Sequence, residues 1–569
     1  MEQRERLSQT CLWIARAAAG EDRGHCLDVY PPLIRDEESP PLVNSSTPED
    51  DFVNGLSQQS SMSVVSILAE SAIRYPNTIA IVTGNERTTY KELWNQTRAT
   101  AGALAAYGVS PGIPVAMLIP NVSDFPRVYY AVLALGGVVV PINPLLKSEE
   151  IAFVLRDSGA QLLVCAAAFL EQAVPAARQA SCTVVSLHSS VDMPESPARL
   201  EDELSKSNPI NSYVPTLPGE AATILYTSGT SGRPKGAVGS HQALIMQVDV
   251  LLLNTLDMRH GDRILGCLPL SHTFGQTCTM NLAFRIGATV ILMPRFDGDE
   301  ALKLMVEYET QLFMGVPSMF VALLGAAKRN VARPPLRYAM SGGAAIPVAI
   351  IEAFRVEFAA HIHEGYGLTE TSPVATFNHV GISPRPGTVG QAIWGVQVEV
   401  ADPTRLDTVC LLQVGELGEL VVRGHNIMMG YLNRPDETAR VIVDGWFRTG
   451  DLGVIDDDGY VRVVDRTSDM IIRNGYNVYP REVEEVLARH PSVQQCAVFG
   501  VPHESHGEEI VAAVVLRPEM TMNPKAVRDF MYRQLAAYKV PRRIEIVESL
   551  PLGPSGKVLR RQLVAAFST

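Results

Sequence analysis

The fold of this chain is constrained most by a regular alternation of short apolar runs with longer stretches of helical spacing. In the first part of the chain the apolar runs lie at 79–82, 115–119, 138–141, 162–166 and 183–187. The stretches 90–107 and 125–135, between successive runs, have helical spacing. Strands that alternate with helices in this way are typical of a largely parallel sheet covered by helices. The pattern resumes at 264–268, 289–293, 312–316 and 338–341, so we predict a large domain of layered α/β subdomains.

The length of 569 residues favours two or more domains, because single cores rarely grow so large. Residues 1–61 combine prolines with acidic clusters and little periodicity, which predicts a poorly ordered N-terminal extension. Short β runs between 387 and 465 indicate a β subdomain that closes the large domain, 62–466. The mixed pattern that follows predicts a small α+β C-terminal domain, 467–569.

Composition narrows the functional classes. The net charge of −13 gives no support for a nucleic-acid surface. Eight scattered cysteines without a Cys-x-x-Cys pair fit reduced thiols better than disulfides or a zinc site. The N-terminus lacks the uninterrupted apolar core of a signal peptide, and the apolar stretch 128–140 is too short to span a bilayer. We therefore expect a cytoplasmic protein, with peripheral membrane contact left open and no indication of oligomeric state.

The stretch 226–236 reads Tyr-Thr-Ser-Gly-Thr-Ser-Gly-Arg-Pro-Lys-Gly and directly follows the apolar run 221–225. Glycines let the backbone approach an anion, successive N–H groups form a nest, and Lys235 adds a positive charge. The spacing differs from that of a Walker loop, yet the residue types predict a phosphate-binding loop. The alternative is a flexible surface turn. Further polar turns are expected after strands at 269–275, 342–347 and 363–370, where ligands of open α/β sheets collect.

Five motifs occur in a fixed order: the loop 226–236, Tyr-Gly-Leu-Thr-Glu at 366–370, Trp-Phe-Arg-Thr-Gly-Asp at 446–451, Asp-Arg-Thr-Ser-Asp at 465–469 and Pro-Ser-Gly-Lys at 554–557. From about residue 62 to the end, the chain resembles the adenylate-forming superfamily. That superfamily contains acyl-CoA synthetases, aryl-CoA ligases, nonribosomal peptide adenylation domains and firefly-type luciferases. The stretches 365–373 and 473–480 look most like those of fatty acyl-CoA synthetases.

The resemblance implies an enzyme that uses ATP, Mg²⁺ and CoA. A carboxylic acid first attacks the α-phosphate of ATP and forms an acyl adenylate, and CoA then takes the acyl group. Region 62–466 would be the AMP-binding domain, and 467–569 a mobile domain that carries the catalytic lysine, Lys557. Glu370 would ligate Mg²⁺, and His272 would stand at the mouth of the acyl pocket. The residues that the resemblance assigns to ATP are Thr227, Ser228, Gly229, Thr230, Ser231, Gly232 and Lys235 on the β- and γ-phosphates, Gly343, Ala344 and Tyr366 around adenine, Thr369 on the α-phosphate, Asp451 and Arg466 on the ribose, and Gly367 with no part of the nucleotide specified.

The resemblance also implies that the C-terminal domain rotates between the two steps. The hinge position is usually Asp or Lys in the family and is Ser468 here, which is a departure. Gly475 would then line the CoA tunnel. Each assignment has a structural alternative: Tyr366 as core, Asp451 as a turn residue, Arg466 as a surface ion-pair partner and His272 as a structural histidine.

Medium- or long-chain fatty acids are the substrates we expect, because the segment 313–320 is apolar and could line the acyl pocket, although it could equally be core. Three other functions stay open. These are an aryl-CoA ligase, an acyl-adenylate ligase that loads a carrier protein, and a non-catalytic nucleotide or acyl-ligand sensor on the same fold.

Overall fold

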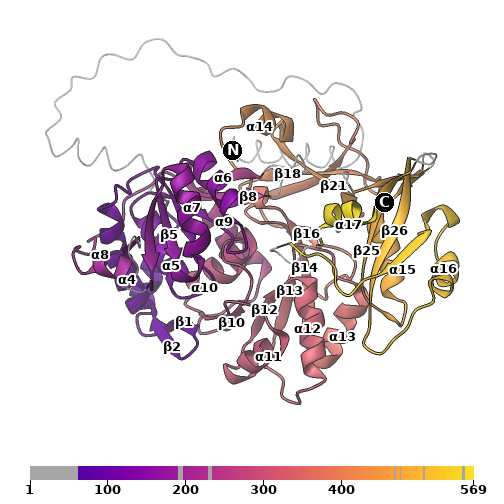
Figure 1. Ribbon diagram of the computed structural model, residues 1–569, viewed down its shortest axis with the longest axis horizontal. Helices are drawn as coiled ribbons and strands as arrows, with labels where there is room; N and C mark the ends of the chain where they lie inside the picture. The colour runs from indigo at the N-terminus through magenta and orange to yellow at the C-terminus, as the bar shows by residue number, and fades with distance from the viewer. Residues whose placement is uncertain are drawn as a thin grey trace, which may run out of the picture. The chain divides into compact units, whose positions relative to one another are not determined.

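The computed structural model describes residues 62–568, except for 190–196, 228–233, 467–468, 474–475, 504–506 and 554–557. Within these ranges the strands form four sheets, and helices pack against them (Figure 1). The predicted alternation of strands and helices is confirmed, and the fold is mixed α/β, with a large N-terminal and a smaller C-terminal domain. The predicted extension, 1–61, lies outside the described residues.

The first sheet runs in the order β16-β15-β14-β13-β12-β10-β11-β1-β2. Its central strands, from β11 to β14, are parallel, as the alternation predicted. The strands of this sheet are β1 (Ile79–Thr83), β2 (Glu86–Thr89), β10 (Arg263–Gly266), β11 (Thr289–Leu292), β12 (Leu312–Gly315), β13 (Tyr338–Ser341), β14 (His361–Gly367), β15 (Val374–Phe377) and β16 (Gln391–Ala392).

Helices α11 (Gly298–Glu307), α12 (Pro317–Ala327) and α13 (Val348–Phe358) lie together beside β12 and β13 (Figure 1). The Asp297 side chain accepts hydrogen bonds from the first-turn N–H groups of α11, and a proline starts α12, so both helix starts are set locally. Between sheet and helices, the Phe320 ring packs edge-on at 5.2 Å from both Phe313 and Phe354. These fully buried rings hold the helices against one face of the sheet.

The second sheet has the order β19-β9-β8-β4-β3-β5-β6-β7. Its last member in sequence, β19, joins β9 from far along the chain. The strands are β3 (Pro114–Leu118), β4 (Val138–Pro141), β5 (Leu162–Ala166), β6 (Thr183–Leu187), β7 (Ala198–Arg199), β8 (Ala221–Thr227), β9 (Lys235–Ser240) and β19 (Gly430–Tyr431). The helices that belong to this part of the chain are α3 (Ser66–Arg74), α4 (Tyr90–Ala105), α5 (Asp124–Ala134), α6 (Ser148–Ser158), α7 (Leu170–Ala180), α8 (Leu200–Leu204), α9 (His241–Val250) and α10 (Leu282–Arg285).

The third sheet is the predicted β subdomain, and the fourth is the core of the C-terminal domain. The third contains β17 (Val396–Ala401), β18 (Gly418–Gly424), β20 (Ile442–Val443), β21 (Trp446–Ile455) and β22 (Val461–Arg466), with α14 (Pro435–Val441) next to β20. The fourth contains β23 (Ile471–Arg473), β24 (Tyr476–Val478), β25 (Val493–His503), β26 (Gly507–Leu516) and β27 (Arg543–Ile546), with α15 (Pro480–Ala488), α16 (Pro524–Tyr532) and α17 (Arg560–Phe567). Among the described helices, none has the length and apolar character needed to cross a bilayer.

The prediction of a turn at 363–370 is wrong for residues 363–367, because β14 continues through Gly367. Residues 363 and 364 pair with β13, and residues 365–367 pair with the antiparallel β15. Partners on both sides therefore hold a polar, glycine-containing sequence in an extended conformation, against its local preference. The turn itself begins only after Gly367, at η4 (Thr369–Thr371).

Candidate active site

Three of the residues predicted to bind ATP form one hydrogen-bonded group. The Tyr366 hydroxyl donates to Asp451 Oδ2 over 2.7 Å, and Arg466 Nε lies 3.0 Å from Asp451 Oδ1. Asp451 and Arg466 stand opposite each other on the antiparallel strands β21 and β22. Burial raises the pKa of Tyr366 well above its ordinary value, and the nearby Asp451 carboxylate raises it further. A carboxylate offers about four acceptor positions, so the two contacts leave Asp451 with capacity for further donors.

Lys235 and Glu370 are brought together through Tyr431, a residue of β19. The Lys235 ammonium lies 5.0 Å from the centre of the Tyr431 ring, and the Tyr431 hydroxyl donates to Glu370 Oε1 over 2.8 Å. Lys235 also forms an ion pair with Glu437, in the first turn of α14. Because β19 pairs with β9, the strand that Lys235 begins, the backbone of Tyr431 is held beside that strand.

The two strands that flank the predicted phosphate loop are held in register. Thr227 ends β8 and stands opposite Lys235 at the start of β9. Residues Ser228, Gly229, Thr230, Ser231 and Gly232, which were also assigned to phosphate, lie outside the described residues. The ends of the loop are therefore known, and the role of the segment between them stays a prediction.

Local geometry favours glycine at two of the residues predicted to bind ATP, Gly343 and Gly367. Gly343 has a φ of 80°, in the left-handed region that glycine adopts without strain, and it precedes Ala344 in the turn after β13. An added Cβ at Gly367 would overlap the carbonyl of Pro373, so only glycine fits beside that backbone. Thr369 follows in η4, and adjacent Glu370 is 7% exposed.

His272 lies in the turn after β10, just before the π-helical segment η3 (Phe274–Asn281). The Phe274 N–H donates to His272 Nδ1 over 3.2 Å, so the proton of the neutral ring resides on Nε2. Burial lowers the pKa of His272 to about 4, which keeps the imidazole neutral at physiological pH. The ring is thus a hydrogen-bond donor rather than a cation.

The segment 313–320, which was expected to line an acyl pocket or to be core, divides between the two faces of the first sheet. Phe313 and Phe320 belong to the core beneath α11, α12 and α13. Met314 and Val316 belong instead to the cluster that includes Phe274, on the face that carries η3. An added Cβ at Gly342 would lie 3.3 Å from the Phe274 ring, so the turn after β13 approaches this apolar region closely.

Three predicted residues of the C-terminal domain, Lys557, Gly475 and the hinge residue Ser468, lie outside the described residues. Their assignments stay predictions. For Mg²⁺, the described residues contain no cluster of three or more His, Cys, Asp or Glu side chains arranged around a metal. That is compatible with Mg²⁺, which proteins often hold with one or two carboxylates while substrate phosphates and water complete the shell. Glu370, buried and oriented by Tyr431, fits that role.

Sequence reasoning missed Tyr431, Glu437 and Glu364. The available signals for the first two were a Gly-Tyr pair and Pro435, which starts α14, but neither points to a distant lysine. Glu364 follows His363 in β14, where burial raises the pKa of its carboxyl to about 8. Its place before Tyr366 was visible in the sequence, whereas its burial was not.

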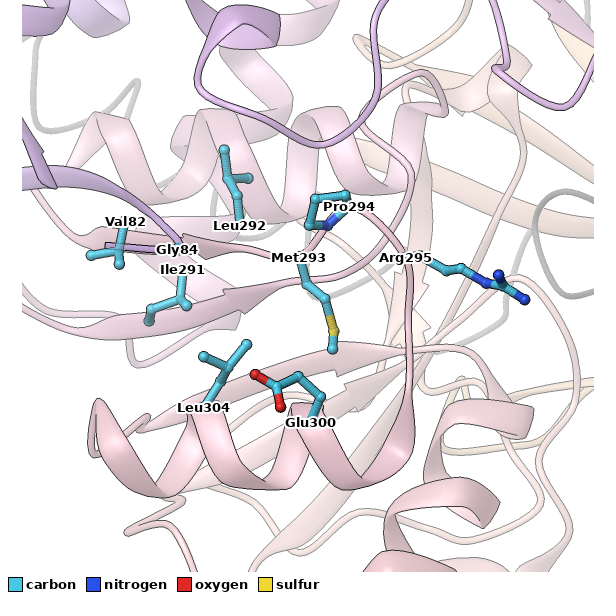
Figure 2. A pocket seen from close by; sticks show the side chains of 9 residues that line it. All are labelled: Val82, Gly84, Ile291, Leu292, Met293, Pro294, Arg295, Glu300 and Leu304. Carbon is cyan, nitrogen blue, oxygen red and sulfur yellow. The ribbon is translucent and has the colours of Figure 1, made fainter. Parts of the chain in front are cut away.

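A cavity of about 220 Å³ lies at the carboxyl ends of β1 and β11, against α11 (Figure 2). Its walls are mainly apolar, and the Arg295 side chain points away from it (Figure 2). The residues that line it are Val82, Gly84, Ile291, Leu292, Met293, Pro294, Arg295, Glu300 and Leu304. None of these residues belongs to the set predicted to bind ATP, the acid or CoA.

Comparisons with known proteins match nearly all of the described chain. Residues 68–432 match the model of the AMP-binding enzyme family, and residues 482–557 match that of the AMP-binding enzyme C-terminal domain. The long-chain-fatty-acid–CoA ligase of Bacillus subtilis (strain 168) is 31% identical over 532 residues, covering 88% of this chain and 93% of that protein. The feruloyl-CoA synthase of an Amycolatopsis species is 34% identical over 499 residues, covering 86% of this chain and 96% of that protein. The structure of ATP-bound MatB from Rhodopseudomonas palustris superposes with a TM-score of 0.80, covering 89% of this chain and 99% of that chain, and the two sequences are 30% identical.

Proposed function

Because the chain belongs to the AMP-binding, adenylate-forming enzyme family, we propose that it activates a medium- or long-chain fatty acid with ATP and transfers the acyl group to CoA. The observation that carries this proposal is the convergence of Lys235, Glu370 and Tyr431 at the ends of the phosphate loop. The Tyr366, Asp451 and Arg466 group supplies the nucleoside end. The products would be acyl-CoA, AMP and pyrophosphate.

In the first step an oxygen of the fatty acid carboxylate attacks the α-phosphorus of ATP. The bond from that phosphorus to the bridging oxygen of the β-phosphate breaks, and pyrophosphate leaves. Lys235, with residues 227–232, would hold the β- and γ-phosphates, and Lys557 would bridge the acid and the α-phosphate. Positive charge placed where negative charge develops lowers the barrier of such transfers. Mg²⁺ bound by Glu370 would neutralise phosphate charge.

The neutral His272 would orient the acid. With Nδ1 occupied by the Phe274 N–H, its Nε2–H can donate to a carboxylate oxygen without carrying charge itself. A low pKa suits this role, because the uncharged ring does not compete with Lys557 as a cation. The apolar side chains of Phe274, Met314 and Val316 nearby favour an aliphatic acyl chain over a second carboxylate.

In the second step the CoA sulfur, as thiolate, attacks the acyl carbonyl, and AMP leaves with the shared oxygen. The C-terminal domain would rotate about Ser468 so that Gly475 lines the pantetheine tunnel, where a side chain would block the thiol. Gly475→Leu should therefore spare adenylate formation and abolish thioester formation. Equal loss of both half-reactions would refute the two-conformation mechanism.

A second candidate, an aryl-CoA ligase, is favoured by the 34% identity with a feruloyl-CoA synthase. The test is acid-dependent exchange of pyrophosphate into ATP, with straight-chain acids of increasing length and aromatic acids measured side by side. We expect the fastest exchange with medium or long aliphatic acids. A preference for aromatic acids would overturn the fatty acid assignment, and no exchange with any acid would favour the sensor. Product analysis with CoA and with a holo carrier protein identifies the acyl acceptor.

A further inference from the structure

Lys235, which is proposed to bind the β- and γ-phosphates, already has a carboxylate partner within the chain. Lys235 Nζ is paired with Glu437 Oε2, and both side chains are mostly shielded, with 15% of the lysine and 26% of the glutamate side chain exposed. Glu437 is not among the residues that were predicted to bind ATP. We infer that Glu437 occupies the place of a phosphate oxygen on Lys235 and opposes the binding of ligands that carry a pyrophosphate group.

The inference rests on the proposed function, because it takes Lys235 as the grip on the β- and γ-phosphates. An ammonium has three donors, so Lys235 could contact a phosphate oxygen while it remains near Glu437. A carboxylate and a phosphate held by one ammonium lie only a few ångström apart, and like charges at that distance repel. Either Glu437 moves away or the phosphate binds less tightly than it would without Glu437.

Glu437 can release the lysine without losing all its charge partners. Its other oxygen, Oε1, lies 3.6 Å from Arg434 Nη1, one turn earlier. Arg434 is itself held in place, because its Nη2 lies 2.9 Å from Asp157 Oδ1. Tyr226, in the strand before the phosphate loop, donates to the second oxygen of that aspartate over 2.9 Å. An anchored arginine therefore keeps the freed carboxylate paired, which avoids the cost of an isolated partly buried charge.

The effect of Glu437 depends on which phosphates a ligand carries. ATP and pyrophosphate both present phosphates to Lys235, so Glu437 weakens the binding of both. AMP has only the α-phosphate and does not compete for Lys235. Glu437 would thereby assist the departure of pyrophosphate after adenylation, at the expense of a higher dissociation constant for ATP.

The test compares the full-length wild type with Glu437→Gln, which keeps the size of the side chain and removes its charge. Calorimetric titrations use ATP, pyrophosphate and AMP separately, at one Mg²⁺ concentration and without acid or CoA. We expect Glu437→Gln to lower the dissociation constants of ATP and pyrophosphate on the order of fivefold, as for loss of a partly exposed ion pair, and to leave that of AMP unchanged. Product inhibition by pyrophosphate should strengthen in parallel.

Asp436→Asn is the matched control, because it removes one negative charge from the neighbouring, exposed position of α14. If the control tightens ATP equally, the effect is long-range charge and the inference is wrong. The inference is also wrong if Glu437→Gln weakens ATP, since Glu437 would then position Lys235 for binding, or if affinity is unchanged. Failure of the proposed function looks different: the wild type would bind no ATP, or Lys235→Ala would leave ATP binding intact.

Discussion

Replacement of Asp451 by asparagine tests whether this carboxylate holds the ribose of the bound nucleotide. Asp451 is 3% exposed, and each of its oxygens has one protein partner, the Tyr366 hydroxyl on Oδ2 and Arg466 Nε on Oδ1. Two of about four acceptor positions therefore remain for the two ribose hydroxyls. Asn keeps the shape and one acceptor oxygen, so the change removes charge without opening a cavity.

The expected loss of ATP affinity follows from the number of acceptor positions that Asp451 has left for the ribose. A hydrogen bond to a charged group contributes roughly 1.5–3 kcal/mol, so losing one such bond should weaken ATP binding by about 10- to 100-fold. The rate of thioester formation from supplied acyl adenylate at saturation should change less than the affinity for ATP.

The assay compares ATP, 2′-deoxy-ATP and 3′-deoxy-ATP in pyrophosphate exchange, for the wild type, Asp451→Asn and the control Asp436→Asn. The wild type and the control should discriminate against at least one deoxy analogue, and Asp451→Asn should lose that discrimination. If Asp451→Asn binds ATP more weakly but discriminates as well as the wild type, the ribose assignment fails. Asp451 would then act only by holding Tyr366 and Arg466.

Three further predictions concern other parts of the molecule. Burial raises the pKa of Glu364 from about 4.5 to about 8, so over this range the folded chain binds more protons than the unfolded chain and its stability falls as pH rises. Glu364→Gln should flatten that decline in thermal melts between pH 5 and 9, and an unchanged slope would contradict the buried-acid interpretation. Phe320→Ala should lower the free energy of unfolding by ~3–5 kcal/mol in urea titrations, because it empties the ring site between Phe313 and Phe354, and a loss below about 1 kcal/mol would contradict the packing. Lys235→Ala should damage adenylate formation far more than thioester formation from supplied acyl adenylate, and equal damage would assign the loop another role.

The strands and helices could be predicted from the sequence because their signals are local. Apolar runs such as 138–141 and 312–316 matched strands β4 and β12 closely. The strand β14 could not be predicted in this way, since its residues are extended only because β13 and β15 pair with them.

The family motifs identified single residues of the site but not the contacts between them. Tyr366 and Asp451 were named through the family motifs, but their hydrogen bond joins residues 85 apart in sequence, and no local pattern specifies it. The link between Tyr431 and Glu370 spans 61 residues, and the pairing of Glu437 with Lys235 depends on where α14 begins. Such contacts follow from the tertiary fold, which is why a pattern of residue types did not reveal them.

The short strand β19 has a consequence for synthesis of the chain. Gly430 and Tyr431 complete the sheet by pairing with Val238 and Ala237, residues made about two hundred positions earlier. Until they emerge from the ribosome, β9 has an open edge, and Lys235 lacks both its aromatic partner and the glutamate of α14. The proposed ribose-binding residues, Asp451 and Arg466, follow Gly430 in the chain, so nucleotide affinity should arise late in translation. A chain stopped before Gly430 would expose this strand edge and lack part of the proposed nucleotide site.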